Sequence, residues 1–192
     1  MPPDPIARFG RWYRAAARAG VRQPDAVALA SAAPSGAPSV RFVLLKEATA
    51  RGFVIYTDAR SRKGRELHAN ARAALAFHWQ PLGRQVRVEG RVRSVTAAEA
   101  EAYWRTRPRG SQLSAATSHQ SVRLESRASL VARRRALERS LHGRDVPRPA
   151  TWTGFRIEPA AIEFWTHRDD RLHHRERFER TRNGWRLSLL EP

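Results

Sequence analysis

Two lysines stand out in this sequence because nearly every other basic residue is an arginine. Of its 36 basic residues, only Lys46 and Lys63 are lysines. Lysine presents a compact point charge on a flexible stem and arginine a planar fork, so the two cannot always replace each other. Lys46 ends the apolar run Val40–Leu45, and Lys63 lies in Ser61-Arg62-Lys63-Gly64. Both positions suit a phosphate, although two lysines retained by chance would give the same pattern.

The segment around Lys63 is predicted to begin a helix, with Ser61 as its cap and Asn70 near its end. Free backbone N–H groups, the positive end of the helix dipole and two cations together suit an anion. Taken alone, this pattern is also frequent at solvated helix starts.

A second candidate site combines Tyr103, Arg107 and Ser111. Thr96 and Glu99 form a capping box that predicts a helix ending near Arg107, because Pro108 follows. Tyr103 and Arg107 are four residues apart and therefore neighbours on the last turn. Two hydroxyls and a guanidinium could receive a phosphate, although the helix dipole is unfavourable at this end, so Arg107 and Lys46 must supply the charge. Alternatively, Tyr103 packs in the core and Arg107 caps carbonyls.

A third candidate lies in the C-terminal segment, where residues 171–180 are predicted to form a strand. Alternation along a strand would place Arg171, His173 and Arg175 on one face. Two guanidiniums flanking an imidazole suit anion binding or proton handling, whereas the alternative is a charged, soluble hairpin edge. No metal site is predicted here, because His167, Asp169, Asp170 and His173 lack a known ligand spacing.

The elements that must position these residues are many short strands with inserted helices. Helices are predicted over about 4–19, 61–70, 96–107 and 124–141. Strands are predicted over 40–46, 53–57, 73–79, 85–95, 153–157, 161–167, 171–180 and 185–190, with an apolar segment over 26–33. This order predicts a mainly β (α+β) fold, an antiparallel barrel with peripheral helices, in a single domain over residues 1–192.

Composition narrows the class of protein. The 192 residues are 41% hydrophobic and contain no cysteine, which excludes disulfides and thiolate metal sites. Residues 1–5 lack the apolar core of a signal peptide, and no apolar run could span a bilayer, so a cytoplasmic protein without membrane contact is expected. The net charge of +18 raises nucleic-acid binding as an alternative. The arginines are spread throughout and no nucleic-acid motif accompanies them, so anionic small molecules are the expected partners. GxGxxG, Walker and GxSxG sequences are absent, which argues against Rossmann, P-loop and α/β-hydrolase proteins.

The order of these segments resembles that of the pyridoxamine 5′-phosphate oxidases over about residues 4–192. The matching segments are Arg41-Phe42-Val43-Leu44-Leu45-Lys46, Tyr56-Thr57, Ser61-Arg62-Lys63, Arg84-Gln85-Val86, Arg107-Pro108-Arg109-Gly110-Ser111-Gln112, Gln120-Ser121, Glu163-Phe164-Trp165 and Arg171-Leu172-His173-His174-Arg175.

The resemblance implies an FMN-binding split β-barrel that works as a homodimer with FMN at the interface. It implies that FMN is bound by Arg41, Phe42, Val43, Leu44, Tyr56, Thr57, Arg62, Lys63, Gln85, Gln120, Ser121, Trp165 and Arg175. It further implies that the substrate phosphate is bound by Lys46, Tyr103, Arg107 and Ser111. Arg171 and His173, the catalytic candidates, would lie against the substrate ring.

The implied reaction moves a hydride from C4′ of pyridoxine 5′-phosphate or pyridoxamine 5′-phosphate to the flavin. Pyridoxal 5′-phosphate forms, and O2 reoxidises the flavin to give H2O2. The sequence departs from the family at His174, where an acidic residue is frequent, and it begins almost at the first helix, so a segment that covers the substrate is expected to be short or missing. FMN oxidases of phenazine biosynthesis, which need no substrate-phosphate set, are the alternative on the same fold. A flavin- or nucleic-acid-binding module without catalysis is a third possibility.

Overall fold

The computed structural model describes residues 4–192; residues 1–3, part of the segment in which no signal peptide is predicted, lie outside it. The chain starts with helix α1 (Pro5–Arg18), whose first turn is capped by the Asp4 carboxylate, which accepts a hydrogen bond from the Ile6 N–H. Phe9 and Ala16 on its apolar stripe are buried against the sheet, so the helix predicted over 4–19 is confirmed.

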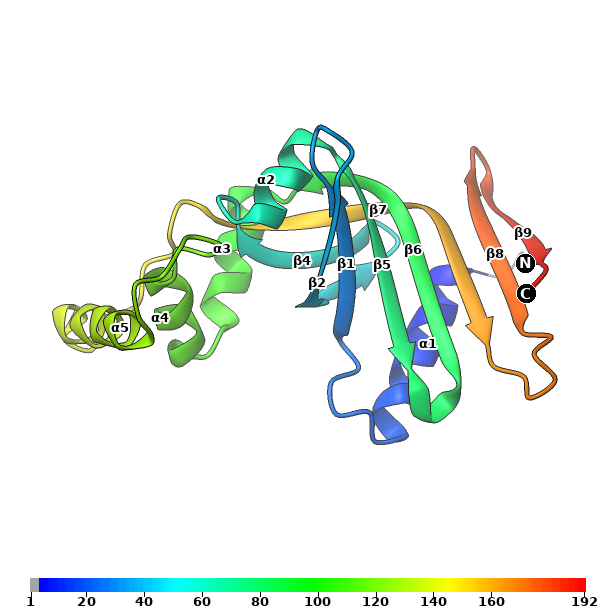
Figure 1. Ribbon diagram of the computed structural model, residues 1–192, viewed down its shortest axis with the longest axis horizontal. Coiled ribbons are helices and arrows are strands. Elements are labelled where there is room, and N and C mark those ends of the chain that lie inside the picture. The colour runs from blue at the N-terminus through cyan, green and yellow to red at the C-terminus, as the bar shows by residue number, and fades with distance from the viewer. Residues whose placement is uncertain (1–3) are drawn as a thin grey trace.

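The strands form one antiparallel sheet that curls around the core (Figure 1). Its order is β2-β1-β5-β6-β7-β4-β3, and β8 and β9 extend it from β7. The strands are β1 (Ala26–Ala32), β2 (Pro38–Leu44), β3 (Glu47–Thr49), β4 (Gly52–Asp58), β5 (Arg72–Trp79), β6 (Arg84–Ser94), β7 (Trp152–Thr166), β8 (His174–Thr181) and β9 (Gly184–Leu190). The expected mainly β fold with peripheral helices is confirmed.

Strand β7 corrects the prediction of two strands over 153–157 and 161–167. It runs without a break through Pro159, which lies opposite Gly90 where the register between β6 and β7 shifts. A bulge tolerates proline because the ladder hydrogen bond is already interrupted there. A Cβ on Gly90 would lie 2.0 Å from the Glu158 carbonyl oxygen, so this close crossing requires glycine.

Four further helices and a 3-10 turn, η1 (Gln80–Leu82), connect the strands. They are α2 (Arg62–Ala69), α3 (Ala97–Thr106), α4 (Arg109–Thr117) and α5 (Arg127–Leu141). The Ser61 cap of α2 and the Thr96/Glu99 capping box of α3 are both present, as predicted. Helix α4 was not predicted, and α5 begins three residues later than expected because Ser126 caps it. Figure 1 shows α3, α4 and α5 grouped at one end of the molecule, with β8 and β9 at the other.

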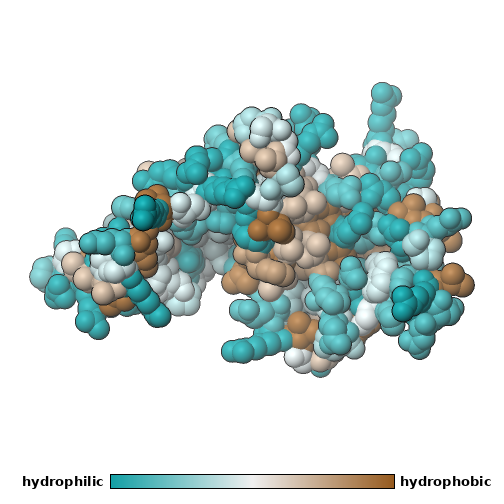
Figure 2. Space-filling model, in the orientation of Figure 1, coloured by the Kyte–Doolittle hydropathy of each residue, from teal (hydrophilic) through white to brown (hydrophobic). Residues whose placement is uncertain are grey.

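Strand β2 is an edge strand that carries large apolar side chains on its exposed face. Val40 and Phe42 are 68% and 76% exposed, and Figure 2 shows apolar residues gathered in the middle of this view, around β1 and β2. Exposed apolar edges are uncommon in monomers, because they invite pairing with another chain. Within residues 4–192, none of the helices has the length and apolar character needed to cross a membrane.

Candidate functional site

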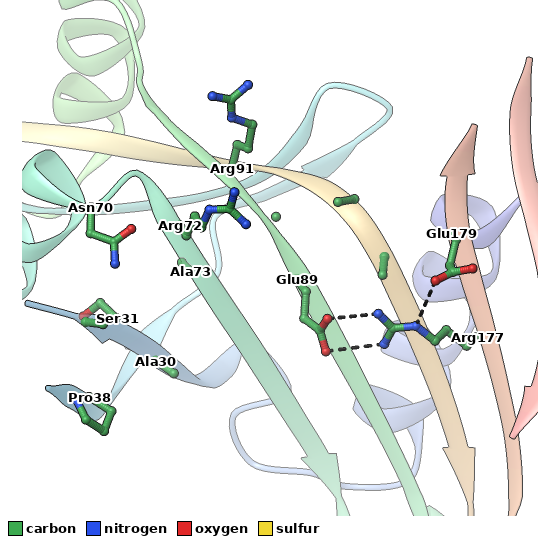
Figure 3. Close-up of a pocket in the computed structure, with 14 residues that line it drawn as sticks. Ala30, Ser31, Pro38, Asn70, Arg72, Ala73, Glu89, Arg91, Arg177 and Glu179 are labelled. Atoms are coloured by element: carbon green, nitrogen blue, oxygen red, sulfur yellow. Dashed lines mark hydrogen bonds and ion pairs between the residues drawn. The ribbon is translucent and has the colours of Figure 1, made fainter. Parts of the chain in front are cut away.

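A cavity of about 280 Å³ lies where β2, β4, α2, α3 and the start of β7 come together. Its lining includes residues from both predicted sets and is formed by Phe42, Val43, Leu44, Lys46, Tyr56, Thr57, Lys63, Tyr103, Arg107, Ala115, Gln120 and Trp152. A larger hollow of about 670 Å³ lies elsewhere on the sheet, between Ala30 and Arg177 (Figure 3). None of the predicted site residues lines that hollow, and the smaller cavity is the one that gathers residues of both predicted sets, so it is the candidate site.

Lys63 provides the positive charge at one side of the cavity. Its Nζ atom donates to Thr57 Oγ1 and to Gln120 Oε1, both at 3.1 Å, and the Thr57 hydroxyl also donates to Gln120 Oε1. These partners are neutral, and burial, together with the nearby Arg41 guanidinium, lowers the pKa of Lys63. A cation held by neutral groups is ready to accept an anion.

Arg41 and Arg62 lie beside this group but turn toward Glu66. Arg41 Nη2 is 3.1 Å from Glu66 Oε2, and Arg62 Nε is 2.8 Å from Glu66 Oε1. Burial alone would raise the pKa of Glu66, but hydrogen bonds from Ser31, Ser39, Arg62 and Arg41 bring it down to about 2. Two guanidiniums therefore face one carboxylate, which leaves a net positive charge on this group. Neither arginine lines the cavity itself.

Ser121 connects α2 to the loop before α5. Its Oγ atom accepts a hydrogen bond of 3.0 Å from the Arg62 N–H, and its φ of 67° is unusual for a residue other than glycine. The start of α2 and the Gln120-Ser121 segment are therefore brought together. The family resemblance assigns both of these segments to FMN binding.

Tyr103 and Arg107 also line the cavity and lie on a stack of aromatic rings. Tyr103 stacks on Tyr56 with ring centroids 4.2 Å apart, and the Arg107 guanidinium lies over Trp152 at 4.8 Å. Burial lowers the pKa of Arg107, and its Nη1 atom is buried without a hydrogen-bond partner. Lys46 also lines the cavity and pairs with Asp25 at 3.1 Å. The alternative in which Arg107 only caps carbonyls does not account for that unpartnered atom.

Ser111 lies in the first turn of α4, not in a loop after α3. Pro108 ends α3 but also caps α4, because proline fits the start of a helix. The Ser111 N–H donates to the Pro108 carbonyl, and Ser111 is not among the residues that line the cavity. The unfavourable dipole end of α3 is thus followed at once by the favourable end of α4.

Gln85, Trp165 and Arg175 lie side by side on one face of β6, β7 and β8. Gln85 pairs with Trp165, and Trp165 pairs with Arg175. The Arg175 Nε atom donates to the buried carboxylate of Glu163 at 2.9 Å. These three predicted FMN-binding residues are therefore together, but in a place separate from the cavity.

Arg171 and His173 do not lie on a strand, because β8 starts at His174. The prediction that they share one strand face with Arg175 is therefore wrong. Asp170 accepts a hydrogen bond from the Leu172 N–H, and this Asx turn replaces the strand ladder. Arg171 has a φ of 65°. The His173 ring nevertheless lies 4.6 Å from that of Trp165, and its Nδ1 atom accepts from the Arg168 N–H. His173 thus joins the Trp165 group without sharing its strand.

The two groups lie at opposite ends of β7. Thr153 pairs with Thr57 of the cavity, whereas Trp165 lies twelve positions further along the same strand. A strand rises about 3.3 Å per residue, so roughly 40 Å of strand separates them. Figure 1 shows the β7–β8 turn and helices α3–α5 at opposite ends. One chain therefore does not bring Arg171 and His173 to Arg107.

Sequence reasoning missed two residues of the site. Trp152 lines the cavity and supports Arg107, and it follows the Pro147/Pro149 break without any local signal. Glu66, four residues after Arg62 on the same helix, had a signal in that spacing. The described residues contain no group of three or more His, Asp or Glu side chains that could hold a metal.

Known proteins match the chain along its whole length. Residues 13–166 match the family model for pyridoxamine 5′-phosphate oxidase, and residues 152–192 match that for the pyridoxine 5′-phosphate oxidase C-terminal dimerisation region. A pyridoxine/pyridoxamine 5′-phosphate oxidase of Rubrobacter xylanophilus is 52% identical over 99% of this chain and 88% of its own length. One from Myxococcus xanthus is 50% identical over 100% of this chain and 93% of its own length.

Among solved structures, PhzG from Burkholderia lata, in complex with tetrahydrophenazine-1-carboxylic acid, aligns with a TM-score of 0.94 and 36% identity over 100% of this chain and 94% of that one. A pyridoxamine 5′-phosphate oxidase-related, FMN-binding protein from Nostoc punctiforme, 14% identical over the full length of both chains, shares the fold with a TM-score of 0.79. Two family models that together span residues 13–192, and relatives half identical to the chain, place this protein in the pyridoxamine 5′-phosphate oxidase family.

Proposed function

We propose that the protein is an FMN-dependent oxidase that converts pyridoxine 5′-phosphate or pyridoxamine 5′-phosphate to pyridoxal 5′-phosphate, with O2 as electron acceptor and H2O2 as product. The observation that carries this proposal is the cavity, whose lining brings together three cationic side chains, those of Lys46, Lys63 and Arg107. FMN and a phosphorylated vitamer each bring one phosphate, so two receivers in one cavity match that pair of ligands.

The residues on the Lys63 side fit FMN. Lys63 has neutral hydrogen-bond partners, and Arg41 and Arg62 outnumber the single carboxylate of Glu66, so a dianionic phosphate gains charge-assisted hydrogen bonds there. Thr57 and Gln120 offer neutral donors and acceptors beside it. When bound, FMN supplies the redox chemistry by accepting a hydride from the substrate and passing electrons to O2.

The residues on the Arg107 side bind and orient the substrate phosphate. The Arg107 Nη1 atom has no hydrogen-bond partner, and Arg107, Tyr103 and Lys46 line the same cavity. Arg171 and His173 place the pyridine ring and assist proton loss at its C4′ substituent. His173 accepts at Nδ1 from the Arg168 N–H, so its Nε2 atom remains for the substrate.

The active unit is a homodimer, because one chain holds the two halves of the site at opposite ends of β7. A second copy supplies Arg171, His173, Trp165, Arg175 and Gln85 to the cavity of the first. Two observations support this arrangement: the apolar exposed face of β2 includes Phe42 at the cavity rim, and residues 152–192 match a dimerisation region. In a two-fold dimer each copy gives and receives one half-site.

Subunit mixing tests the shared site. Assayed at a vitamer concentration well below the KM of the Arg107→Ala variant, Arg107→Ala and Arg171→Leu dimers are each expected to be nearly inactive. Random reassociation makes half of the dimers mixed, and each mixed dimer has one intact site, so about a quarter of the wild-type activity returns. A mixture that stays inactive while exchange is verified by mass would show that each chain builds its own site. Mixing either variant with itself is the control.

A second candidate, an FMN oxidase acting on phenazine precursors, is supported by the close structural match to PhzG. The fold does not separate the two reactions, because both are built on it. The residues of the cavity do separate the two reactions. A substrate without a phosphate group has no need for Arg107, Tyr103 and Lys46 in the cavity lining. The oxidation of a phosphorylated vitamer is therefore the stronger reading.

The deciding experiment is anaerobic. Pyridoxine 5′-phosphate added to the yellow, FMN-loaded protein should bleach the oxidised-flavin absorbance, and air should restore it with release of pyridoxal 5′-phosphate. Unphosphorylated pyridoxine is the matched control and should bleach far more slowly. Firmly bound FMN that no vitamer bleaches would refute the proposed reaction and point to another substrate. A colourless protein carrying nucleic acid would instead support a binding module.

A further inference from the structure

Arg107 is a half-buried cation without an anion. In the part of the chain that the structure describes, Tyr103 is the one group whose charge influences the pKa of Arg107. The Nη1 atom of Arg107 has no hydrogen-bond partner, and no carboxylate in residues 4–192 forms an ion pair with the side chain. An arginine side chain has many rotamers, so some other contact must hold this one in the cavity wall.

Two tryptophan faces provide that contact. The Arg107 guanidinium carbon lies 4.8 Å from the ring centroid of Trp152 and 5.2 Å from that of Trp104. Both distances fall within the range of a cation–π interaction, which is strongest where water is excluded. Trp152 is only 4% exposed and lines the cavity, whereas Trp104 does not line it.

Trp152 is itself held firmly. Its ring is nearly parallel to Tyr56, at 5.1 Å and 10°, and meets Trp104 edge to face at 4.8 Å. Its backbone N–H donates to the Pro149 carbonyl, and its own carbonyl accepts from Arg148 Nη1 at 2.7 Å. These contacts fix the ring so that it presents one face to Arg107.

We propose that Trp152 is a positioning residue for phosphate recognition, which holds the Arg107 guanidinium in the cavity wall so that the guanidinium meets the substrate phosphate. This inference rests on the proposed function and adds a residue to it. Trp152 makes no contact with the reacting carbon in this role, so its loss weakens binding of the phosphorylated substrate and leaves the chemical step largely intact.

Trp152 also belongs to the small core around Trp104, Leu113 and Val146, so a purely structural role is the competing explanation. Trp152→Leu removes the aromatic face, whereas Trp152→Phe keeps a smaller one. The matched control is Trp185→Leu, because Trp185 has a comparable partner in Arg180 at 5.0 Å but lies on β9, outside the cavity.

The experiment measures kcat and KM of the FMN-loaded dimer with pyridoxine 5′-phosphate. Trp152→Leu is expected to raise KM about tenfold with kcat within about twofold, Trp152→Phe to recover most of the loss, and Trp185→Leu to change neither. In an Arg107→Ala background, Trp152→Leu should raise KM no further, because the interaction is already gone. Equal KM increases in both backgrounds would overturn the proposal.

Titration with inorganic phosphate keeps the two proposals separate. Heat of binding to FMN-loaded protein reports the phosphate site without turnover. If the wild type binds phosphate through Arg107 but oxidises no vitamer, the proposed reaction fails, and weaker phosphate binding by Trp152→Leu still supports the positioning role. Unchanged phosphate binding by Trp152→Leu would overturn it. If the leucine variant does not fold, Trp152→Met, which fills more of the space but also lacks the aromatic face, replaces it with the same two outcomes.

Discussion

Neutralising Glu66 should destabilise the protein in a way that depends on pH. The Glu66 carboxylate is 6% exposed and accepts hydrogen bonds from Ser31 and Ser39 as well as from two arginines. Glu66→Gln keeps the size of the side chain and one acceptor oxygen but removes the charge that Arg41 and Arg62 face. The loss is therefore mainly electrostatic.

The magnitude follows from the pKa. A fall in the pKa of Glu66 from 4.5 in the unfolded chain to about 2 in the folded protein is equivalent to roughly 3 kcal/mol at neutral pH. The Arg62 side chain is 61% exposed, and solvent screens its attraction, so we expect about 1.5–2 kcal/mol. Because the folded pKa is the lower one, this contribution is complete above about pH 4.5 and is lost as pH falls toward 2.

Urea unfolding of FMN-free wild type and Glu66→Gln, at pH 6.5 and at pH 3, measures both quantities. The cofactor is removed because a ligand that binds only the folded state adds its own stability. The difference in unfolding free energy should be about 1.5–2 kcal/mol at pH 6.5 and less than half of that at pH 3. Glu125→Gln, in the exposed loop before α5, is the control. A difference that is the same at both pH values would refute the electrostatic reasoning.

Three further predictions concern the cofactor, the catalytic face and the sheet. Lys63→Met should weaken FMN binding about 10–100-fold, because a charge-assisted hydrogen bond is lost, and flavin fluorescence quenching measures this. Arg171→Leu should cut turnover while FMN stays bound. Unchanged turnover would show that Arg171 is not a catalytic residue. Gly90→Ala should destabilise by at least about 2 kcal/mol, because the new Cβ would lie 2.0 Å from the Glu158 carbonyl oxygen. In thermal melts, Gly10→Ala on α1, whose Cβ meets nothing closer than 3.5 Å, should instead be neutral or slightly stabilising.

Local signals in the sequence predicted the elements with clear caps and alternation. Ser61 and Thr96 cap α2 and α3 through side-chain hydrogen bonds within three residues, so their starts are visible in a short window. The sequence does not predict helix α4, because Pro108 indicates the end of α3 and gives no separate sign that it also begins the next helix. The sequence predicts two strands in place of β7, because a proline within a strand is tolerated only where the partner strand bulges. That partner is more than sixty residues away in the sequence.

Local patterns predicted the separate phosphate sites, and the family resemblance implied a site at a dimer interface, but which residues lie together at each end of β7 was not predictable. Lys46, Lys63 and Arg107 come from separate parts of the chain, and long-range pairing such as that of Thr57 with Thr153 brings them to one cavity. The Asx turn at Asp170 moved Arg171 out of the strand, since a local hydrogen bond outcompeted the ladder. Trp152 had no local signal, because its role depends on rings contributed by other elements.

The central position of β7 in the sheet also determines when the sheet can form during folding. This strand pairs with β4, β6 and β8, and Ile157 meets Phe53, about a hundred residues earlier in the chain. Contacts so far apart in sequence are slow to form, because a long loop must close before they contribute. During synthesis, the edges of β4 and β6 that pair with β7 remain unpaired until β7 has left the ribosome. A nascent chain paused ahead of Trp152 is therefore the state in which this protein is most open to aggregation.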